Sequence, residues 1–485
     1  MSVIGLDIGS HTIKAVELSG SRGALRLERV AIEPTPENSF VNGVIIDAEA
    51  LGQAVANLIR NGGFRTRKVV SSLGGQTDLV VRVTEVPRMS GKQLREAMKW
   101  DVERHIPFPA TNIVMDFAPI EVEGEDPESP NMEILLAVAK EEYVFNHLKV
   151  LDAAGLEPQA IDIEQLAGPR AVLEGKPEPP KERCVAVVNI GAELTDISIV
   201  QDGVLRFPRQ IPLAGENLTT AIGQSFVVDA KEAEELKRQY ATVSLEAPAE
   251  EGEEEPEELM GAPLAYDWVE EETEVETVQP VSVAGAEEKP EEEAEPTVEL
   301  GAEEEGPILM DTVDGPVFEE PEETAPPEAD ETLVEGAEGP PAEEAPPGPP
   351  PAEEPGRGAF LETAEEDVVS DMGRRVPEDP EQTKAQMSET LMPVLAELAG
   401  EIRTSINYFV DRHEGVEVEK VILIGGSAKI ENLPEFLERE LGIPTEIGNP
   451  FEGMEWDRET YTEEYLREIA PIVAVSVGLA MRDMV

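Results

Sequence analysis

A fifteen-residue pattern occurs twice in this sequence, and the repeat limits the folds available to the chain. Residues 4–18 read "IGLDIGSHTIKAVEL" and residues 186–200 read "AVVNIGAELTDISIV". At a constant offset of 182 residues Asp7 falls on Asn189, and a glycine follows two residues later in both copies. Alternating apolar residues on both sides predict two strands joined by a tight turn. A repeat at this distance indicates a duplicated domain, because the repeats of solenoid proteins are much shorter.

The segments after each copy alternate between strands and helices. Hydrophobic periodicity predicts strands at residues 25–34, 68–75, 79–87, 203–213 and 420–430. It predicts helices at residues 47–63, 215–227, 229–241 and 381–412. This alternation is typical of α/β domains. We therefore expect a duplicated α/β fold.

Between the two halves lies a segment with a pattern of its own. Periodicity predicts a helix at 90–109, strands at 112–122 and 131–140, and a second helix at 141–155. These elements are sufficient for a small α+β subdomain inserted into the first half. The predicted domains are a first half at 1–89 and 157–183, an inserted subdomain at 90–156, and a second half at 184–242 and 380–485.

The remaining residues, 243–379, are dominated by acidic side chains and proline. Residues 245–367 alone carry 43 acidic and two basic side chains, together with 19 of the 41 prolines. Such a composition cannot bury enough apolar surface to offset the entropy lost when its backbone is ordered. We therefore expect 243–379 to be a long disordered acidic insertion. Its charge argues against nucleic acid or anionic lipid as a partner.

Cysteine, histidine and hydropathy narrow the class of protein. Cys184 is the sole cysteine, so no intramolecular disulfide is possible, and the four histidines show no metal-ligand spacing. A strand expected from residue 3 leaves no room for a signal peptide. The longest C-terminal apolar run, residues 469–481, is too short to cross a bilayer. We expect a cytoplasmic protein that does not insert into the membrane itself.

The paired glycine turns indicate a phosphate-binding site. A strand that breaks at glycine exposes backbone N–H groups with no Cβ to block an approaching oxygen atom. Asp7, beside the first turn, is placed to hold a hydrated Mg²⁺ ion. The alternative is a pair of ordinary hairpin turns, and the matched second copy favours the phosphate site.

A third turn, Gly425-Gly426-Ser427, follows a buried strand and would let a base and ribose approach the backbone closely. Glu234 and Lys237 lie one helical turn apart and are candidates for the ribose hydroxyls. An ion pair between these two side chains is the alternative.

Two phosphate hairpins, a later Gly-Gly turn and a duplicated α/β core resemble the actin-like ATPase superfamily, with its ribonuclease H-like fold. Within that superfamily, "MKWDVERHIPFP" and "IPLAGENLTTAIGQSFVVDAKEAEELKR" resemble the type IV pilus assembly protein PilM family. The resemblance covers about residues 1–242 and 380–485. It implies ATP and Mg²⁺ as cofactors, with the metal held by Asp7 through water. It implies nucleotide contacts at Asp7, Gly9, Ser10, His11, Thr12, Lys14, Asn189, Gly191, Thr195, Asp196, Glu234, Lys237, Gly425, Gly426, Ser427 and Lys429.

The resemblance also implies a partner. The family binds the N-terminal cytoplasmic tail of the inner-membrane protein PilN, in a groove between the first half and the inserted subdomain. Contact with PilO and the assembly ATPases is then indirect. We expect an extended peptide in this groove, with alternate apolar side chains entering pockets. The chain would be an ATP-binding scaffold for pilus biogenesis and twitching motility, held at the inner membrane through PilN.

One residue departs from the pattern of the family. Asn189 occupies a position where many relatives carry aspartate, and an amide brings no charge to a metal. The sequence also shows no clear catalytic base. We therefore expect weak turnover, with ATP acting as a structural or switching ligand.

Two other functions stay open at this point. A sugar or acetate kinase of the same superfamily would need a carboxylate base facing a substrate pocket. A filament-forming cell-division protein resembling FtsA would need a C-terminal amphipathic membrane helix, whereas "GLAMRDMV" follows directly on the last expected core helix.

Overall fold

The computed structural model describes residues 2–41, 43–75, 77–120, 129–174, 176, 182–245, 376–377, 379–413 and 415–484. They belong to one compact unit, made of residues 1–254 and 363–485. The prediction of a disordered insertion at 243–379 therefore lies almost wholly outside the described residues. At its edge, Val243 is buried and its N–H donates to the carbonyl of Glu431 at 2.9 Å, so we place the start of the insertion after this residue.

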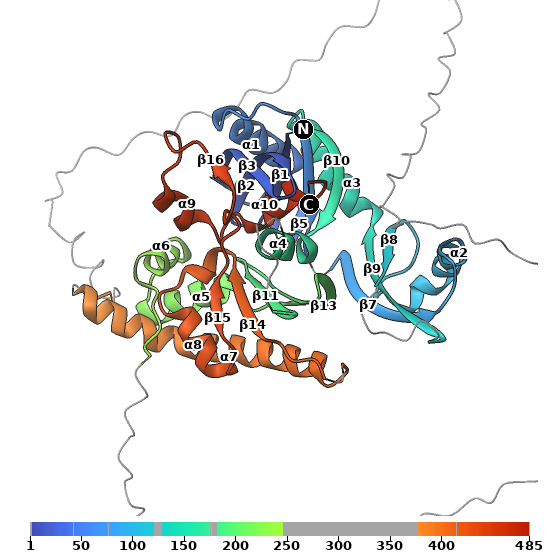
Figure 1. The fold of residues 1–485 in the computed structure, drawn as a ribbon. Coiled ribbons are helices and arrows are strands. Elements are labelled where there is room, and N and C mark those ends of the chain that lie inside the picture. The colour runs from blue at the N-terminus through green and yellow to red at the C-terminus, as the bar shows by residue number, and fades with distance from the viewer. Residues whose placement is uncertain are drawn as a thin grey trace, which may run out of the picture. The chain divides into compact units, whose positions relative to one another are not determined.

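The first copy of the repeat forms the centre of a six-stranded sheet with the order β10-β6-β1-β2-β3-β16 (Figure 1). Its strands are β1 (Val3–Ile8), β2 (Thr12–Ser21), β3 (Ala24–Pro34), β6 (Lys68–Leu73), β10 (Glu157–Ile163) and β16 (Glu455–Trp456). β1 and β2 are the predicted antiparallel hairpin, and β6 runs parallel to both β1 and β10. The carboxyl ends of β1, β6 and β10 therefore lie at the same end of the sheet.

The second copy forms the centre of a five-stranded sheet with the order β13-β12-β11-β14-β15. Its strands are β11 (Cys184–Ile190), β12 (Thr195–Gln201), β13 (Val204–Ile211), β14 (Lys420–Ile424) and β15 (Thr445–Ile447). The two hairpins correspond residue for residue, because Asn189 lies opposite Asp196 as Asp7 lies opposite Lys14. β14 and β15 extend in parallel from β11, as β6 and β10 do from β1. The prediction of a duplicated α/β fold is confirmed.

A three-stranded antiparallel sheet forms the inserted subdomain, in the order β7-β9-β8. Its elements are β7 (Leu79–Pro87), α2 (Gly91–Asp101), η1 (Val102–Arg104), β8 (Ile113–Pro119) and β9 (Asn131–Lys140). α2 and η1 bury their apolar side chains against β9. The next helix, α3 (Glu141–Ala153), packs on α1 (Ala48–Asn61) of the first half. We therefore propose 79–140 as the bounds of the subdomain, in place of 90–156.

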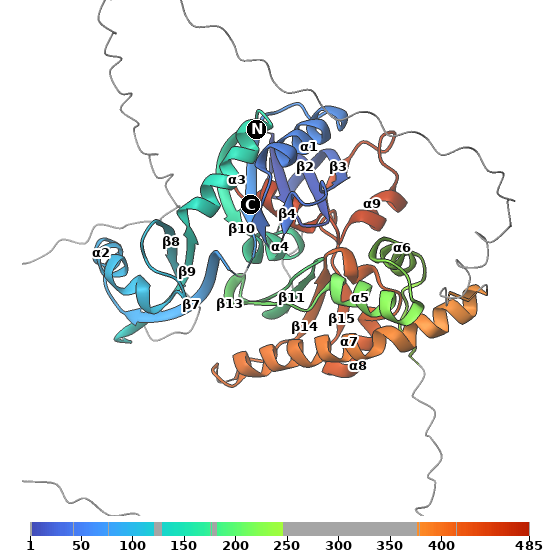
Figure 2. The ribbon, with the colours of Figure 1, turned by 180° about the vertical axis from the view of Figure 1, so that it is seen from behind.

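Helices pack on both faces of each large sheet. α1 and α3 lie on one face of the first sheet, and α4 (Glu164–Leu173) and α10 (Ala474–Met481) lie on the other. On the second sheet, α7 runs along the outer face with α5 and α6, as Figures 1 and 2 show. The remaining elements are β4 (Phe40–Val41), β5 (Val44–Ile45), α5 (Gly215–Phe226), α6 (Ala230–Tyr240), α7 (Pro380–Val410), η2 (Gly426–Lys429), α8 (Leu433–Leu441) and α9 (Glu463–Ile469).

Helix α4 was not predicted from the sequence, and Pro169 lies in its interior. Proline has no N–H, so the carbonyl four residues earlier, that of Gln165, has no helical donor. The hydroxyl of Ser198 on β12 donates to this carbonyl at 3.2 Å. The fold thus satisfies in tertiary structure a group that the helix leaves unpaired.

The last helix approaches the first strand and α4 at backbone distance. A Cβ on Gly478 would lie 1.8 Å from the carbonyl oxygen of Ala167, and a Cβ on Gly5 would lie 1.9 Å from that of Ser476. Only glycine fits at these two positions, so α10 can lie between α4 and β1.

We predict that Gly478→Ala destabilises the protein by about 3 kcal/mol, because the added methyl forces α10 away from α4. The matched control is Gly400→Ala on α7, where a Cβ meets no atom within 4 Å. This control should stabilise by about 0.5–1 kcal/mol, since alanine is the better helix former. Thermal unfolding measures both; a Gly478→Ala protein as stable as wild type would contradict the packing argument.

Candidate functional site

The carboxyl ends of the strands open into one cavity of 580 Å³, which we call the cleft. The first sheet contributes the turn after β1, the Ser72–Gly75 segment after β6 and Glu164 after β10. The second sheet contributes the turns after β11 and β14. In α/β sheets ligands bind beyond the carboxyl ends of parallel strands. Here both halves direct these ends into the same space.

Most of the residues predicted for the site line the cleft. They are Asp7, Gly9, Ser10, His11, Thr12, Lys14, Asn189, Gly191, Asp196, Glu234, Lys237, Gly425, Gly426, Ser427 and Lys429. Thr195 is placed differently, because it is fully buried and its hydroxyl donates to the carbonyl of Leu213 at 2.7 Å. Its position indicates that Thr195 holds β12 against the segment before α5, in place of a ligand contact.

Backbone hydrogen bonds close the two hairpin turns in the same way. The N–H of Gly9 donates to the carbonyl of Thr12 at 3.1 Å, and that of Gly191 donates to Leu194 at 3.0 Å. The third turn lies against the second, where Gly425 has φ of 92°. A Cβ on Gly425 would lie 2.4 Å from the Ile190 carbonyl oxygen, so this position requires glycine both for its backbone angle and for space.

The two hairpins differ in the charged side chains at their paired positions. In the first, Lys14 donates to Asp7 at 3.1 Å, and both side chains are largely buried. In the second, Asn189 donates to Asp196 at 3.3 Å. The carboxylate missing at Asn189 is therefore supplied by the residue opposite, Asp196, which also faces the cleft. The sequence analysis considered position 189 alone and therefore did not predict that Asp196 supplies the carboxylate.

Amide groups surround the carboxyl of Asp196. Gln165 and Gln210 each donate to its Oδ1 at 2.8 Å, and Asn189 donates to Oδ2. Burial raises the pKa of Asp196 to about 6, and the three amide hydrogen bonds limit this rise because they favour the charged form. The group is thus held in one orientation while its charge is sensitive to pH near 6.

Glu164 is an acidic residue of the cleft that the sequence analysis missed. Burial, followed by the nearby charges of Asp196 and Asp7, raises the pKa of Glu164 well above its ordinary value. Its carboxyl lies against the turn at Gly74, whose carbonyl accepts the hydroxyl of Tyr143. A signal was present: Glu164 directly follows an alternating apolar strand, as a functional residue at a carboxyl end does. This signal was missed because helix α4, which begins at Glu164, was not predicted.

Neutral polar side chains form the wall on the first half. Burial lowers the pKa of His147 to about 4, so its ring is neutral at pH 7 and donates from Nε2 to Ser71 at 2.9 Å. Ser71 in turn donates to the carbonyl of Leu6 at 2.8 Å. Ser72, Tyr143 and His147 line the cleft, and the sequence analysis named none of them.

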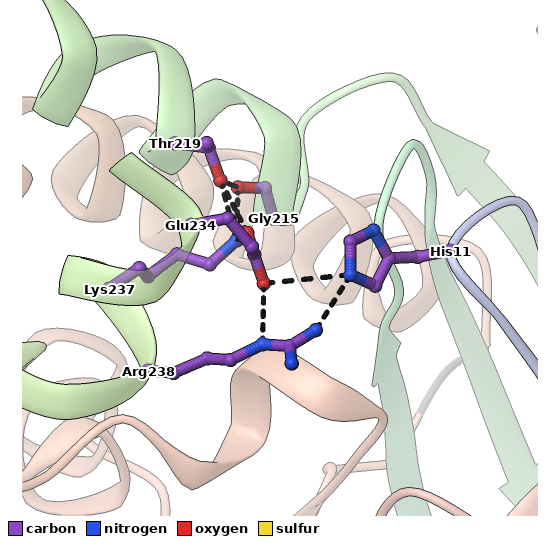
Figure 3. A network of polar contacts seen from close by, with 6 residues as sticks. All are labelled: His11, Gly215, Thr219, Glu234, Lys237 and Arg238. Carbon is purple, nitrogen blue, oxygen red and sulfur yellow. Dashed lines mark hydrogen bonds and ion pairs between the residues drawn. The ribbon is translucent and has the colours of Figure 1, made fainter. Parts of the chain in front are cut away.

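A polar network on α6 forms the opposite rim (Figure 3). Lys237 donates to the Gly215 carbonyl at 2.9 Å and to Thr219 at 2.7 Å, and its Nζ lies 2.6 Å from Glu234. These three acceptors use all three hydrogens of the ammonium group. The structure therefore shows an ion pair between Glu234 and Lys237, which the sequence analysis gave as the alternative to contacts with ribose. The pair is mostly buried.

His11 joins the first hairpin turn to this network across the mouth of the cleft (Figure 3). Arg238 donates from Nη2 to Nε2 of His11 at 2.7 Å, and Glu234 lies 3.9 Å from the same nitrogen. Burial lowers the pKa of His11, which keeps the ring neutral and able to accept this bond. The two halves thus touch at the rim of the cleft as well as at its base.

Known proteins resemble this chain in sequence and in fold. The sequence matches the family described as Type IV pilus assembly protein PilM over residues 5–244 and 373–484. The chain belongs to the PilM family.

Among solved structures, this PilM-family chain is similar to one titled "PilM-PilN type IV pilus biogenesis complex". The TM-score is 0.62 at 24% identity, over 99% of this chain and 98% of that chain. The likeness shows a shared fold. The prediction of an actin-like ATPase fold is thereby confirmed.

Curated relatives are cell division proteins FtsA. That of Pseudomonas aeruginosa is 29% identical over 264 residues, which is 49% of this chain and 61% of that protein. That of Bacillus subtilis is 26% identical over 258 residues, 49% of this chain and 57% of that protein. The PilM-family chain thus spans about three-fifths of the length of these relatives.

The acidic residues of this PilM-family cleft suit a cation that keeps its water. Within the described ranges, no three His, Cys, Asp or Glu side chains are arranged to bind a metal ion directly. Asp7, Glu164 and Asp196 nevertheless approach one another closely enough that their charges interact. Mg²⁺ usually retains several waters and takes one or two carboxylates, which fits this spacing.

We predict that Asp196→Asn stabilises the ligand-free protein at pH 7.5 and has little effect at pH 4. An acid whose pKa is raised on folding favours the fold below its ordinary pKa, 3.8, and loses that contribution as pH rises to about 6. The expected gain at pH 7.5 is up to about 3 kcal/mol, measured by urea unfolding at both pH values.

Asp202→Asn, on the turn between β12 and β13, is the matched control. Its carboxyl accepts two hydrogen bonds from Arg183, which lower its pKa, so this variant should lose rather than gain stability at pH 7.5. An equal effect of Asp196→Asn at both pH values would contradict the assignment of a raised pKa.

Proposed function

We propose that this PilM-family protein binds ATP with Mg²⁺ in the cleft and acts as a scaffold of the type IV pilus assembly machinery. The observation that carries the first part is the pair of matched glycine turns that face one cavity from two sheets. Such turns present backbone N–H groups to phosphate oxygens. The third turn, at Gly425, is the candidate for the adenosine end.

Lys14 and the two aspartates of the hairpins support the metal part of the proposal. Asp7 and Asp196, when both are ionised, carry more negative charge than Lys14 offsets, and a hydrated Mg²⁺ would neutralise the excess. Asp7 and Asp196 lie at corresponding ends of the two hairpins and would hold its waters. Mg²⁺ would supply charge neutralisation, and the amides of Gln165 and Gln210 would keep Asp196 oriented.

The raised pKa of Glu164 supports slow turnover. Burial and the neighbouring acids disfavour the charged form of this carboxyl, and only the charged form can act as a general base. The kinase alternative requires a carboxylate base facing the cleft, and Glu164 lines the cleft in surroundings that disfavour the carboxylate form. We therefore favour ATP as a switching ligand over ATP as a phosphoryl donor.

We predict that Asp7→Ala weakens Mg²⁺-ATP binding at least about tenfold, or about 1.4 kcal/mol, because Lys14 loses its partner and the waters of the metal lose a carboxylate acceptor. Isothermal titration calorimetry measures the affinity. The control is Asp78→Ala, which removes a similar carboxylate–lysine pair, with Lys140 at 2.6 Å, outside the residues that line the cleft. Equal ATP affinity in both variants would remove Asp7 from the site.

The free edge of the inserted subdomain supports the second part of the proposal, the binding of the PilN tail. Among the described residues, no strand pairs with the outer edge of β8. The N–H of Ile120 donates to Glu133 on β9, and pairs alternate along an antiparallel ladder, so the backbone N–H of Met115 points outward. An extended peptide can extend a sheet at such an edge.

Apolar side chains lie beside this edge. Val114 on β8 is 46% exposed, and Phe145 on the adjoining helix α3 is 56% exposed. β8 belongs to the inserted subdomain and α3 packs on the first half, so this is the seam expected for the peptide. The similar structure of a PilM–PilN complex supports the choice of partner.

Membrane association is proposed through this partner. No described helix is long and apolar enough to span a bilayer. A bound tail of an inner-membrane protein would hold the PilM-family chain at the membrane surface. Contacts with PilO and the assembly ATPases would then be indirect.

We predict that Val114→Asp weakens binding of a labelled peptide with the sequence of the PilN cytoplasmic tail at least about tenfold, because a charge enters the apolar seam. Fluorescence anisotropy measures the affinity. The matched control is Ile447→Asp, which changes a residue of similar exposure, 43%, on the edge strand β15. Loss of binding in the control, or none in Val114→Asp, would reject the seam as the site.

A further inference from the structure

Strand β13 connects the cleft to the inserted subdomain through two side chains. Near one end, Arg206 forms an ion pair with Glu133 on β9 at 2.5 Å. The side chain of Arg206 is 5% exposed and that of Glu133 is 29% exposed, so the pair is largely shielded from water. Near the other end, Gln210 donates to Asp196 inside the cleft at 2.8 Å.

A β-bulge directs Arg206 toward the subdomain. Val200 lies opposite Leu205 and Ile199 lies opposite Phe207, so Arg206 is the extra residue of the bulge. Leu205 packs in the core between the two large sheets, whereas Phe207 packs on the side of α7. A single bulge produces this change of face and re-aims the side chain that it contains.

The inserted subdomain contains a pair of opposed glutamates, and Arg206 compensates the charge of one of them. Glu133 lies directly opposite Glu85 on β7, and like charges in that position repel each other. Arg206 compensates the charge of Glu133 from the second half. Leu135, two residues further along β9, packs against the core between the large sheets. Thus β9 contacts the second half through this charge pair, and Leu135 adds an apolar contact with the core that both halves share.

The same anchor adjoins the edge proposed for the peptide. The carbonyl of Glu133 accepts from the N–H of Ile120, immediately after β8 ends at Pro119. A shift of Glu133 therefore moves the end of β8 with it. From Asp196 to this point the path consists of hydrogen bonds, one strand and one ion pair.

We propose that β13 couples the cleft to the β7–β9–β8 sheet, with Arg206–Glu133 as the contact that transmits the change. The proposal rests on the proposed function, since it takes a Mg²⁺-nucleotide as the cleft ligand and an extended peptide as the ligand of β8. A ligand that engages Asp196 alters the hold of Gln210 on β13, and β13 alters the position of Glu133. Because coupling between two sites is reciprocal, the peptide changes the nucleotide affinity by the same factor.

The test is a titration of the labelled PilN-tail peptide against the full chain, with and without saturating Mg²⁺-ATP. In wild type we expect ATP to change the peptide affinity by about fivefold or more. In Glu133→Gln that ratio should fall to about one, while ATP and peptide each still bind. The matched control is Glu401→Gln, which removes an ion pair of the same strand, with Arg209 at 2.7 Å on the side of α7. It should retain the wild-type ratio.

A second measurement separates this proposal from the proposed function. Amide hydrogen exchange of residues 113–120 and 131–140 is compared before and after addition of Mg²⁺-ATP, with no peptide present. A change in wild type and Glu401→Gln that is absent in Glu133→Gln supports the coupling, even if the peptide fails to bind. Equal responses in wild type and Glu133→Gln, or no response in wild type despite measured ATP binding, overturn it. Failure of wild type to bind ATP at all overturns both.

Discussion

The close approach of α10 to β1 and α4 is the contact on which the rest of the structure depends. Gly5 and Gly478 remove the side chains that would separate these backbones, and the core that results is shared by both large sheets. The same C-terminal segment fixes the site. Ser476 donates to the carbonyl of Lys14 at 3.2 Å, and the N–H of Gly425 donates to Pro471 at 2.8 Å. The first hairpin and the third turn are therefore positioned by one stretch of chain.

The two halves share one backbone plan but differ in charge. Asp7 and Lys14 nearly neutralise each other in the first hairpin, whereas Asn189 and Asp196 leave one acid in the second. Together with Glu164 this places protonatable groups at the meeting point of the sheets. Without a ligand, the raised pKa values show that the cleft disfavours its own negative charge. A bound cation would stabilise this negative charge. Ligand binding would therefore also stabilise the folded protein.

A scaffold needs its ligand site and its partner site to be separate yet connected. In this PilM-family chain the cleft lies between the two large sheets, and the free edge of β8 belongs to a third. β13 is the strand of the second sheet that reaches both, through Gln210 and Arg206. The bulge at Arg206 turns this side chain toward the subdomain, where it pairs with Glu133.

The sequence by itself determined the duplication and the α/β class, and most of the site residues predicted from it line the cleft. Local patterns suffice for this: alternating apolar residues specify each strand, and a glycine at the end of the strand marks each turn. The sequence also identified the inserted subdomain, although not its bounds, because α3 has the same amphipathic pattern whether it packs on β9 or on α1. The acidic insertion stays a prediction from composition.

Only the tertiary structure decided the rest, since it depends on contacts between residues far apart in the chain. Helix α4 contains Pro169, and Ser198 from another strand satisfies the carbonyl that this proline leaves free. Glu164 became a cleft residue because β10 pairs with β6, which in turn pairs with β1, an order that periodicity does not encode. Asp196 took over the charge missing at Asn189 because the hairpin register places the two opposite each other. A sequence specifies which groups are available, and packing specifies which of them meet.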